Sequence, residues 1–311
     1  MIRASPVSIF THSGMTDPDQ PVSRRAPPTL GLVNDRYHPA VTELIIIVSI
    51  LLALAVGGLV NRRWAASHPG EGLAVGDLIN PLATIAAILL AFVMVEALAS
   101  WDRARERANE EAHIVDKEAE SAGRLVNAEL ALRFRTSLVC YARAVQFQEW
   151  PHMAGGSERS PELSVWSHEF ERISGDIRRT GGDDELDRLI DIDNERSDAR
   201  LARLAEADPS LPIGLNVLML AAVFFSVLGL ATFMNPDNGH RANAGVMLIF
   251  GLVVGGSLII INDLDRPFDG FTRIEPTAME QVQRSMEEDL AGSHSSLAYP
   301  CDAGGVATAI L

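Results

Sequence analysis

Four long apolar segments restrict the fold of this chain more than any other feature. They run from Leu44 to Val60, Leu78 to Ala99, Ile213 to Phe233 and Ala244 to Ile261. The hydrocarbon core of a bilayer is about 30 Å thick, and roughly 17–25 apolar residues cross it as a helix. Barrel strands would alternate in polarity, and these unbroken segments do not. The sequence therefore predicts an all-α integral membrane protein with four transmembrane helices.

The composition agrees with a chain divided between lipid and water. The 311 residues are 47% hydrophobic, and the mean hydropathy is +0.12 although the net charge is -15. Apolar residues gathered in membrane spans, with charges elsewhere, account for both values. A single soluble globule does not account for a positive mean hydropathy together with so large a net charge.

The positions of Arg and Lys predict the orientation of the spans. Four spans place both termini and the segment between the second and third spans on one side. That side carries Arg24, Arg25, Arg36, Arg103, Arg105, Arg107, Lys117, Arg196, Arg200, Arg203, Arg266 and Arg273, whereas the two short loops opposite carry Arg62, Arg63 and Arg241. Because cytoplasmic loops have an excess of Lys and Arg, we expect both termini to lie in the cytoplasm of an inner-membrane protein.

Composition also predicts how the chain is divided. The proline-rich residues 1–40 are expected to form a disordered cytoplasmic tail. Two transmembrane hairpins are expected over residues 41–100 and 213–274, with a helical cytoplasmic segment over residues 101–212 between them. Residues 275–311 are expected to form a second cytoplasmic tail that is mostly disordered.

Several helices are predicted outside the membrane from a 3.6-residue recurrence of apolar side chains. One runs from Trp101 to Trp150 and is expected to bend or break near Gly123. Two more are expected from Glu162 to Arg179 and from Asp184 to Glu206. A short acidic helix is expected from Thr277 to Leu290, and the last twenty residues are expected to be unstructured.

Two small-residue patterns and two cysteines allow further predictions. Gly57-Gly58 in the first span, and Gly251 and Gly255 in the fourth, predict close approach of neighbouring helices. Cys140 and Cys301 are far apart in the sequence and suggest neither a disulfide framework nor a metal cluster. We therefore expect two free thiols in a reducing compartment.

The second span contains an ionisable residue, Glu96. Thr84, Ile88 and Phe92 precede it at steps of four, so the four side chains share one helix face. An ionisable group in a span usually faces a bundle interior or water, which makes this stripe a candidate pore lining. Alternatively, Glu96 lies at the level of the lipid headgroups and pairs with Arg103.

The fourth span ends in an acidic turn that contains Asp263, Asp265, Arg266, Pro267, Asp269 and Gly270. Three carboxylates within seven residues are a possible cation site, because hard cations bind clustered oxygens. The competing and favoured interpretation is a structural turn. In that case Pro267 fixes the backbone, Gly270 adopts a positive φ, and Asp265 caps the turn or pairs with Arg266 or Arg273.

The sequence contains no catalytic or phosphate-binding motif such as GxGxxG, HExxH, GxSxG or CxxC. Asp191 to Glu195 begins like a calcium loop, but Arg196 and Ala202 occupy the positions that need glycine and glutamate. The sequence therefore predicts no enzyme, no cofactor, no bound metal and no nucleic-acid partner.

Four stretches resemble a known family. They are Phe92-Val93-Met94 through Trp101-Asp102, Glu110-Glu111-Ala112, the segment from Ile190 to Arg200, and Asp263-Leu264-Asp265-Arg266-Pro267-Phe268-Asp269-Gly270-Phe271. Together they cover most of Leu44 to Pro276. On these residues the chain resembles the bestrophin-like DUF4239 family of bacterial and plant membrane proteins.

That family is distantly similar to bestrophins, which are pentameric anion channels with four spans and a helical cytosolic portion. The stretch from Leu89 to Phe92, with Trp101, resembles the bestrophin neck helix, and this implies that Thr84, Ile88 and Phe92 lie along a pore. The chain departs from bestrophins at Ser100-Trp101-Asp102, where they have Arg-Trp-Trp, and it lacks their acidic calcium clasp.

Two functional hypotheses of different classes follow. The first is a homo-oligomer, pentameric by resemblance, that conducts anions or other inorganic ions through a hydrophobic constriction gated by wetting. A ring of Glu96 carboxylates would favour cations, so the hypothesis leaves the selectivity open. The second is a non-conducting membrane scaffold or signalling protein that binds a cytoplasmic partner through its helical segment. A transporter is not favoured, because the sequence shows no inverted repeat.

The predicted topology can be tested by cysteine labelling. Single cysteines introduced in residues 61–77 and 235–243 should react with an impermeant maleimide added outside intact cells, because both loops are expected outside. A cysteine at Gly155 should react only after the membrane is opened. Labelling of Gly155→Cys from outside would contradict the topology.

Overall fold

The computed structural model describes residues 39–67, 76–156, 159–181, 183–232, 240–293 and 297–308. The predicted N-terminal tail up to residue 38 lies outside these ranges, as do parts of both loops that join the membrane helices. The described part is helical apart from an isolated antiparallel bridge between Cys301 and Ala307. The all-α prediction is therefore confirmed.

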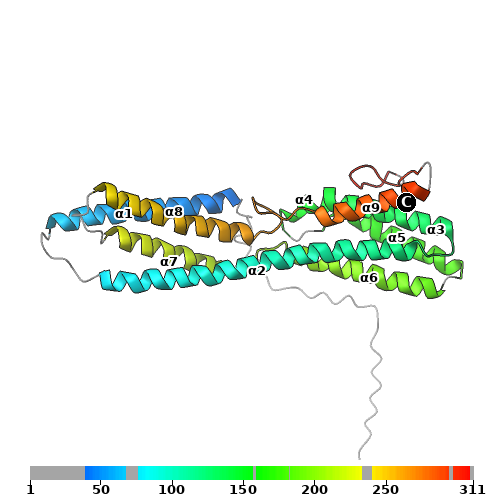
Figure 1. Cartoon of the computed structure of the whole chain (residues 1–311), viewed down its shortest axis with the longest axis horizontal. Helices are drawn as coiled ribbons and strands as arrows, with labels where there is room; N and C mark the ends of the chain where they lie inside the picture. The colour runs from blue at the N-terminus through cyan, green and yellow to red at the C-terminus, as the bar shows by residue number, and fades with distance from the viewer. Residues whose placement is uncertain are drawn as a thin grey trace, which may run out of the picture. The chain divides into compact units, whose positions relative to one another are not determined.

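The elements follow one another in a simple order. They are α1 (Pro39–Ser67), α2 (Gly76–Ala122), α3 (Ala128–Ala144), the π-helical turn η1 (Val145–Glu149), α4 (Trp150–Met153), α5 (Pro161–Arg179), α6 (Asp183–Ala205), α7 (Ile213–Thr232), α8 (His240–Leu264) and α9 (Thr277–Ser293). In Figure 1, α1, α7 and α8 form a bundle with the first half of α2, and the remaining helices pack around its second half.

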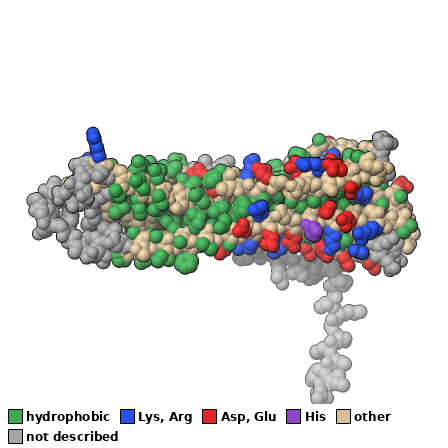
Figure 2. Space-filling model, viewed as in Figure 1, with side chains coloured by type: hydrophobic (Ala, Val, Ile, Leu, Met, Phe, Trp, Pro, Cys, Tyr) green, Lys and Arg blue, Asp and Glu red, His purple; other side chains and the backbone are tan. Residues whose placement is uncertain are grey.

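The first bundle has the properties of a membrane domain. Its helices include the stretches Val41–Arg63, Ala83–Ala122, Ile213–Thr232 and Asn243–Leu264, each long and apolar enough to cross a bilayer. At most 28% of the residues in the apolar window of each stretch are buried inside the chain. Figure 2 shows hydrophobic side chains over this bundle and charged ones over the second. The predicted four membrane helices are therefore present.

α2 connects the two bundles without interruption. Its 47 residues correspond to about 70 Å of helix, more than twice the thickness of a bilayer core. In the second bundle, which we call the helical domain, α2 presents buried alanines to its neighbours, including Ala104, Ala108, Ala112 and Ala119. Small side chains allow α6, α3 and α9 to pack closely around the helix.

The break predicted near Gly123 is present, because α2 ends at Ala122. The turn is fixed by Asn127, whose side chain accepts hydrogen bonds from the N–H groups of Glu129 and Leu130, each at 3.1 Å. Asn127 is thus the N-cap of α3 and satisfies donors that a helix start leaves free.

Glycines on two membrane helices permit close contacts, as predicted. A Cβ on Gly57 would lie 2.5 Å from the Ala231 Cβ of α7. On α8, a Cβ on Gly255 would lie 2.8 Å from Cδ1 of Ile50, and Gly251 faces the same isoleucine. Side chains at Gly57 and Gly255 would therefore force α1 away from its neighbours.

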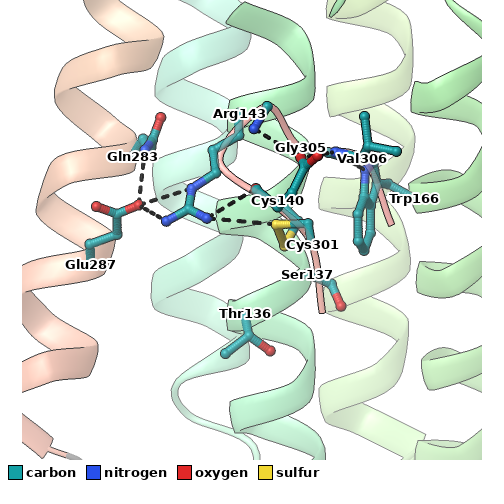
Figure 3. The surroundings of a disulfide bond; sticks show 12 residues. Thr136, Ser137, Cys140, Arg143, Trp166, Gln283, Glu287, Cys301, Gly305 and Val306 are labelled. Atoms are coloured by element: carbon teal, nitrogen blue, oxygen red, sulfur yellow. Dashed lines mark hydrogen bonds and ion pairs between the residues drawn. A yellow bond between two sulfur atoms is a disulfide. The ribbon is translucent and has the colours of Figure 1, made fainter. Parts of the chain in front are cut away.

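The structure corrects two predictions about the end of the chain. Residues 297–308, expected to be unstructured, form a turn that packs against α3 and α5. Cys140 and Cys301, expected to be free, form a disulfide with a Cα–Cα distance of 5.8 Å (Figure 3). The sequence separation of 161 residues gave no sign of this proximity, because tertiary docking of the terminal segment creates it.

A pair of adjacent glycines tests the packing of α1 against α7. Gly57→Ala should destabilise the protein by about 1–3 kcal/mol, because the new methyl overpacks against Ala231. Gly58→Ala is the matched control. A Cβ built at Gly58 meets no neighbouring atom within 4 Å, and alanine has a higher helix propensity than glycine. Thermal unfolding in detergent measures both, and equal melting temperatures would contradict the packing.

Candidate functional site

The four residues singled out on the second span lie on an uncovered face of α2. We call Thr84, Ile88, Phe92 and Glu96 the α2 stripe. All four are exposed, with Phe92 exposed by 72% and Ile88 by 51%. The stripe belongs to a broader exposed face, and small alanines beside it leave a shallow hollow along the helix. A single chain therefore leaves this face to be covered by lipid, by water or by another copy.

The opposite face of α2 holds the membrane bundle together. Val93 and Ala97 are almost completely buried and belong to the apolar core formed with α1, α7 and α8. The orientation of the helix is fixed by this packing. The structure thus brings the stripe together on one face, while its role as a pore lining stays a prediction.

Glu96 has a charged partner on its own helix, and this is the pairing expected under the alternative in which Glu96 lies at the level of the headgroups. Arg103 Nη2 lies 3.4 Å from Glu96 Oε1, with both side chains about half exposed. Glu96 precedes Trp101 by five residues, or roughly 7.5 Å of helix. Trp commonly marks a membrane interface, so this spacing puts the carboxylate on the apolar side of Trp101.

The acidic turn after α8 is organised by Asp263. Its carboxylate is buried and accepts hydrogen bonds from the N–H of Phe271 at 3.0 Å and of Thr272 at 2.9 Å. The Thr272 hydroxyl donates a further bond to the same carboxylate. Gly270 has φ +81°, and a Cβ there would lie 2.0 Å from Asp263 Oδ1. The turn closes around this carboxylate, and only glycine leaves room for it.

Asp265 connects the turn to the start of the third span. Its carboxylate accepts hydrogen bonds from the N–H and hydroxyl of Ser210, both at 2.9 Å, and from the N–H of Leu211 at 3.0 Å. Burial raises the pKa of Asp265, and these three bonds oppose the rise. Asp265 is thus bound to the residues just before α7. Arg273, one of its expected partners, pairs instead with Glu275.

Two tryptophans hold the turn against the rest of the chain. Trp101 on α2 donates its indole N–H to the carbonyl of Thr272 at 2.9 Å, and Trp150 donates to the carbonyl of Ile274 at 2.9 Å. Phe268 packs edge-on against Trp150 with ring centroids 5.4 Å apart. The turn is therefore fixed to both bundles.

These contacts favour the structural interpretation of the turn over a cation site. The oxygens of Asp263 and Asp265 already accept hydrogen bonds from the protein. Among the described residues, no group of three or more His, Cys, Asp or Glu side chains is placed to hold a metal ion.

A buried ion network lies beside the turn in the helical domain. Arg203 is fully buried and binds the carboxylates of both Glu111 and Glu149. Arg200 binds Glu149 at 2.5 Å, and the Tyr141 hydroxyl donates to Glu111 at 2.6 Å. The network joins α2, α3, η1 and α6, so its loss would leave buried charges without partners.

Burial and pairing shift two buried acids of the helical domain in opposite directions: Glu149 of the network, and Glu118 of α2, which Arg196 of α6 contacts at 2.7 Å. For Glu149, burial alone would raise the pKa, but Arg203 and Arg200 outweigh it and hold the pKa below its usual value. For Glu118, burial dominates over the attraction of Arg196 and raises the pKa to about 7. The two guanidinium groups therefore favour the ionised form of Glu149.

Sequence reasoning missed this network. Arg196, Arg200 and Arg203 entered the topology argument as ordinary cytoplasmic charge, yet all three side chains are buried. Their spacing of four and three residues places them on one face of α6, together with buried Leu189 and Ile192. The sequence did contain a signal of this burial, because the three arginines continue the apolar face of the helix.

Comparison with known proteins gives one family and one fold. The Bestrophin-like domain family matches residues 44–279. A search of curated protein sequences finds no match.

Solved structures share the fold. A bacterial bestrophin homologue from Klebsiella pneumoniae superimposes with a TM-score of 0.63 at 16% identity, over 80% of this chain and 99% of that one. A single-residue variant of that homologue gives 0.64 at 15% identity, over 80% and 97%. A third structure, described as a membrane protein, gives 0.63 at 14% identity, over 78% and 98%. At these identities the likeness concerns the fold.

The turn after α8 provides a test of the junction. Gly270→Ala should lower the yield of folded protein and its melting temperature, because the methyl collides with Asp263 and L-residues disfavour a positive φ. Gly292→Ala on α9, where a Cβ meets nothing within 4 Å, is the matched control. Fluorescence-detected size exclusion and thermal unfolding measure both variants. Wild-type behaviour of Gly270→Ala would show that the turn is only a flexible exit from the membrane.

Proposed function

Because the chain belongs to the Bestrophin-like family, we propose that it assembles into a homo-oligomeric ion channel whose pore is lined by the α2 stripe. The bestrophins that it resembles are pentameric anion channels, and we extend both properties to this chain. The membrane domain supplies the pore, and the helical domain forms its cytoplasmic end.

One observation carries the proposal: an exposed carboxylate shares a face of a membrane helix with exposed Phe92. A charged group facing hydrocarbon is costly, so such groups usually face a bundle interior or a water-filled cavity. In a ring of subunits with this face towards the axis, Glu96 would meet water. Phe92 and Ile88 would form an apolar constriction that conducts only when wetted.

The contact between Glu96 and Arg103 removes one objection to permeation by anions. A ring of bare carboxylates would repel anions, but each subunit brings a guanidinium 3.4 Å from its carboxylate. The two opposite charges nearly cancel at the inner mouth. The selectivity then depends on small differences between them, which substitution can shift.

Phe92→Ala tests the constriction. A smaller side chain would widen it and ease wetting, so ion flux into liposomes should rise while the oligomer persists. Leu252→Ala is a suitable control, because Leu252 is also exposed but lies on α8, away from the α2 stripe. If Phe92 instead packs between helices, the oligomer should weaken and flux should stay at background. Absence of flux from wild type and variant, across several ions, would favour the non-conducting scaffold.

Glu96→Gln tests the charge at the inner mouth. The substitution leaves Arg103 unpaired, so the reversal potential should shift towards greater permeability to anions. Glu120→Gln, which removes an exposed carboxylate near the other end of α2, should have a smaller effect. Unchanged selectivity of a conducting Glu96→Gln protein would place Glu96 off the pore, at the level of the headgroups.

A further inference from the structure

The C-terminal segment, residues 297–308, binds the helical domain through hydrogen bonds, a cation–π contact of Arg143 with Tyr299, and packing of Leu297, Tyr299 and Ala307 against the core. The Trp166 indole N–H donates to the carbonyl of Gly305 at 2.9 Å, and the Gln148 amide donates to the carbonyl of Gly304 at 3.2 Å. Arg143 Nη1 donates to the carbonyl of Asp302 at 3.2 Å. Backbone carbonyls therefore accept these three bonds, as in a bound peptide.

Gly305 allows the segment to lie directly on α3. A Cβ at this position would lie 2.2 Å from the backbone nitrogen of Ala144, and its φ is +78°. Any larger residue would lift the turn away from the helix. Docking of the segment on α3 therefore requires glycine at position 305.

A single covalent bond reinforces these contacts (Figure 3). Cys140 on α3 is fully buried, whereas Cys301 in the segment retains 7% exposure. Arg143 Nη1 lies 3.8 Å from the Cys301 sulfur, and Nε and Nη2 of the same guanidinium bind Glu287 of α9. The disulfide is therefore buried, with Cys301 the more exposed of its two residues, and it lies beside a positioned cation.

The compartment in which the helical domain is expected to lie bears on the role of this disulfide. The distribution of Arg and Lys predicts a cytoplasmic helical domain. Disulfides are rare in the cytosol, and those that form there are usually catalytic or redox-sensing. Because this one ties a terminal segment to α3, we expect its reduction to free that segment without unfolding the domain.

We propose that Cys140 and Cys301 form a thiol–disulfide exchange site whose reaction partner is a cellular dithiol, and that reduction releases the C-terminal segment from α3. The site is independent of ion conduction. In the oxidised protein the segment covers Trp166 and Ala144, and in the reduced protein it leaves this surface open to a partner or to solvent.

The exchange balances in two steps. A thiolate of the dithiol attacks the sulfur of Cys301, the less buried residue of the pair, and expels the Cys140 sulfur as a thiolate that takes up a proton. The first step leaves a mixed disulfide between the reductant and Cys301. The second thiol of the reductant attacks the reductant sulfur of this bond and expels the Cys301 thiolate, which Arg143 stabilises until it is protonated. Two electrons and two protons pass from the dithiol to the cystine.

Reduced thioredoxin, the probe dithiol, tests the proposal on the purified full chain. Alkylation with a maleimide polymer counts the free thiols, and hydrogen exchange reports protection of residues 297–308. We expect two thiols to appear and protection of the segment to be lost, while α3 and α5 keep theirs. Reoxidation should restore both signals. A pair that thioredoxin leaves oxidised in the folded protein would overturn the proposal, as would a reduced segment that stays protected.

Two variants separate redox exchange from a general loss of stability. Gly305→Ala should loosen the docking of the segment while both cysteines remain in place. Thioredoxin should therefore reduce the disulfide faster than in wild type. Arg135→Gln removes an ion pair between α3 and α9 away from the sulfurs and should leave the rate unchanged. Equal rates in all three proteins would contradict a link between docking and exchange. A pair that is oxidised in cells grown under every condition would mark a permanent structural bond instead.

Discussion

The continuity of α2 is the constraint on which the rest of the structure depends. One helix of 47 residues belongs to both bundles, so its rotation about its own axis is set by two cores at once. Val93 and Ala97 fix it in the membrane domain, and Glu111 fixes it in the helical domain. The direction in which Phe92 points is therefore determined by contacts on both sides of Trp101.

The junction between the bundles combines buried hydrogen bonds with apolar packing, such as that of Phe268 on Trp150. Asp263 and Asp265 use their carboxylates to satisfy backbone N–H groups at the points where the chain leaves one membrane helix and enters another. Such groups are costly when buried without partners. The indoles of Trp101 and Trp150 satisfy carbonyls of the same stretch. These bonds explain how a short acidic sequence can be held in a defined turn.

The sequence predicted what depends on local pattern and missed what depends on distant contacts. Hydropathy identified the four spans, and a glycine marked the break after α2, because both signals lie within a few residues. The disulfide between Cys140 and Cys301 and the bonds of Arg203 to two glutamates join segments far apart in the chain. Periodicity can mark the arginines of α6 as buried, but it does not name the residues with which they pair. The stripe on α2 was found by its spacing, but spacing alone does not say what covers it.

The central claim is that the exposed face of α2 lines an axial pore. An electron cryo-microscopy map of the wild-type protein in lipid nanodiscs tests it most directly. The account predicts a closed ring of subunits with α2 innermost, the Phe92 side chains converging on the symmetry axis, and Glu96 at the inner mouth. A monomer, or an oligomer with Phe92 directed to the surrounding lipid, would contradict it.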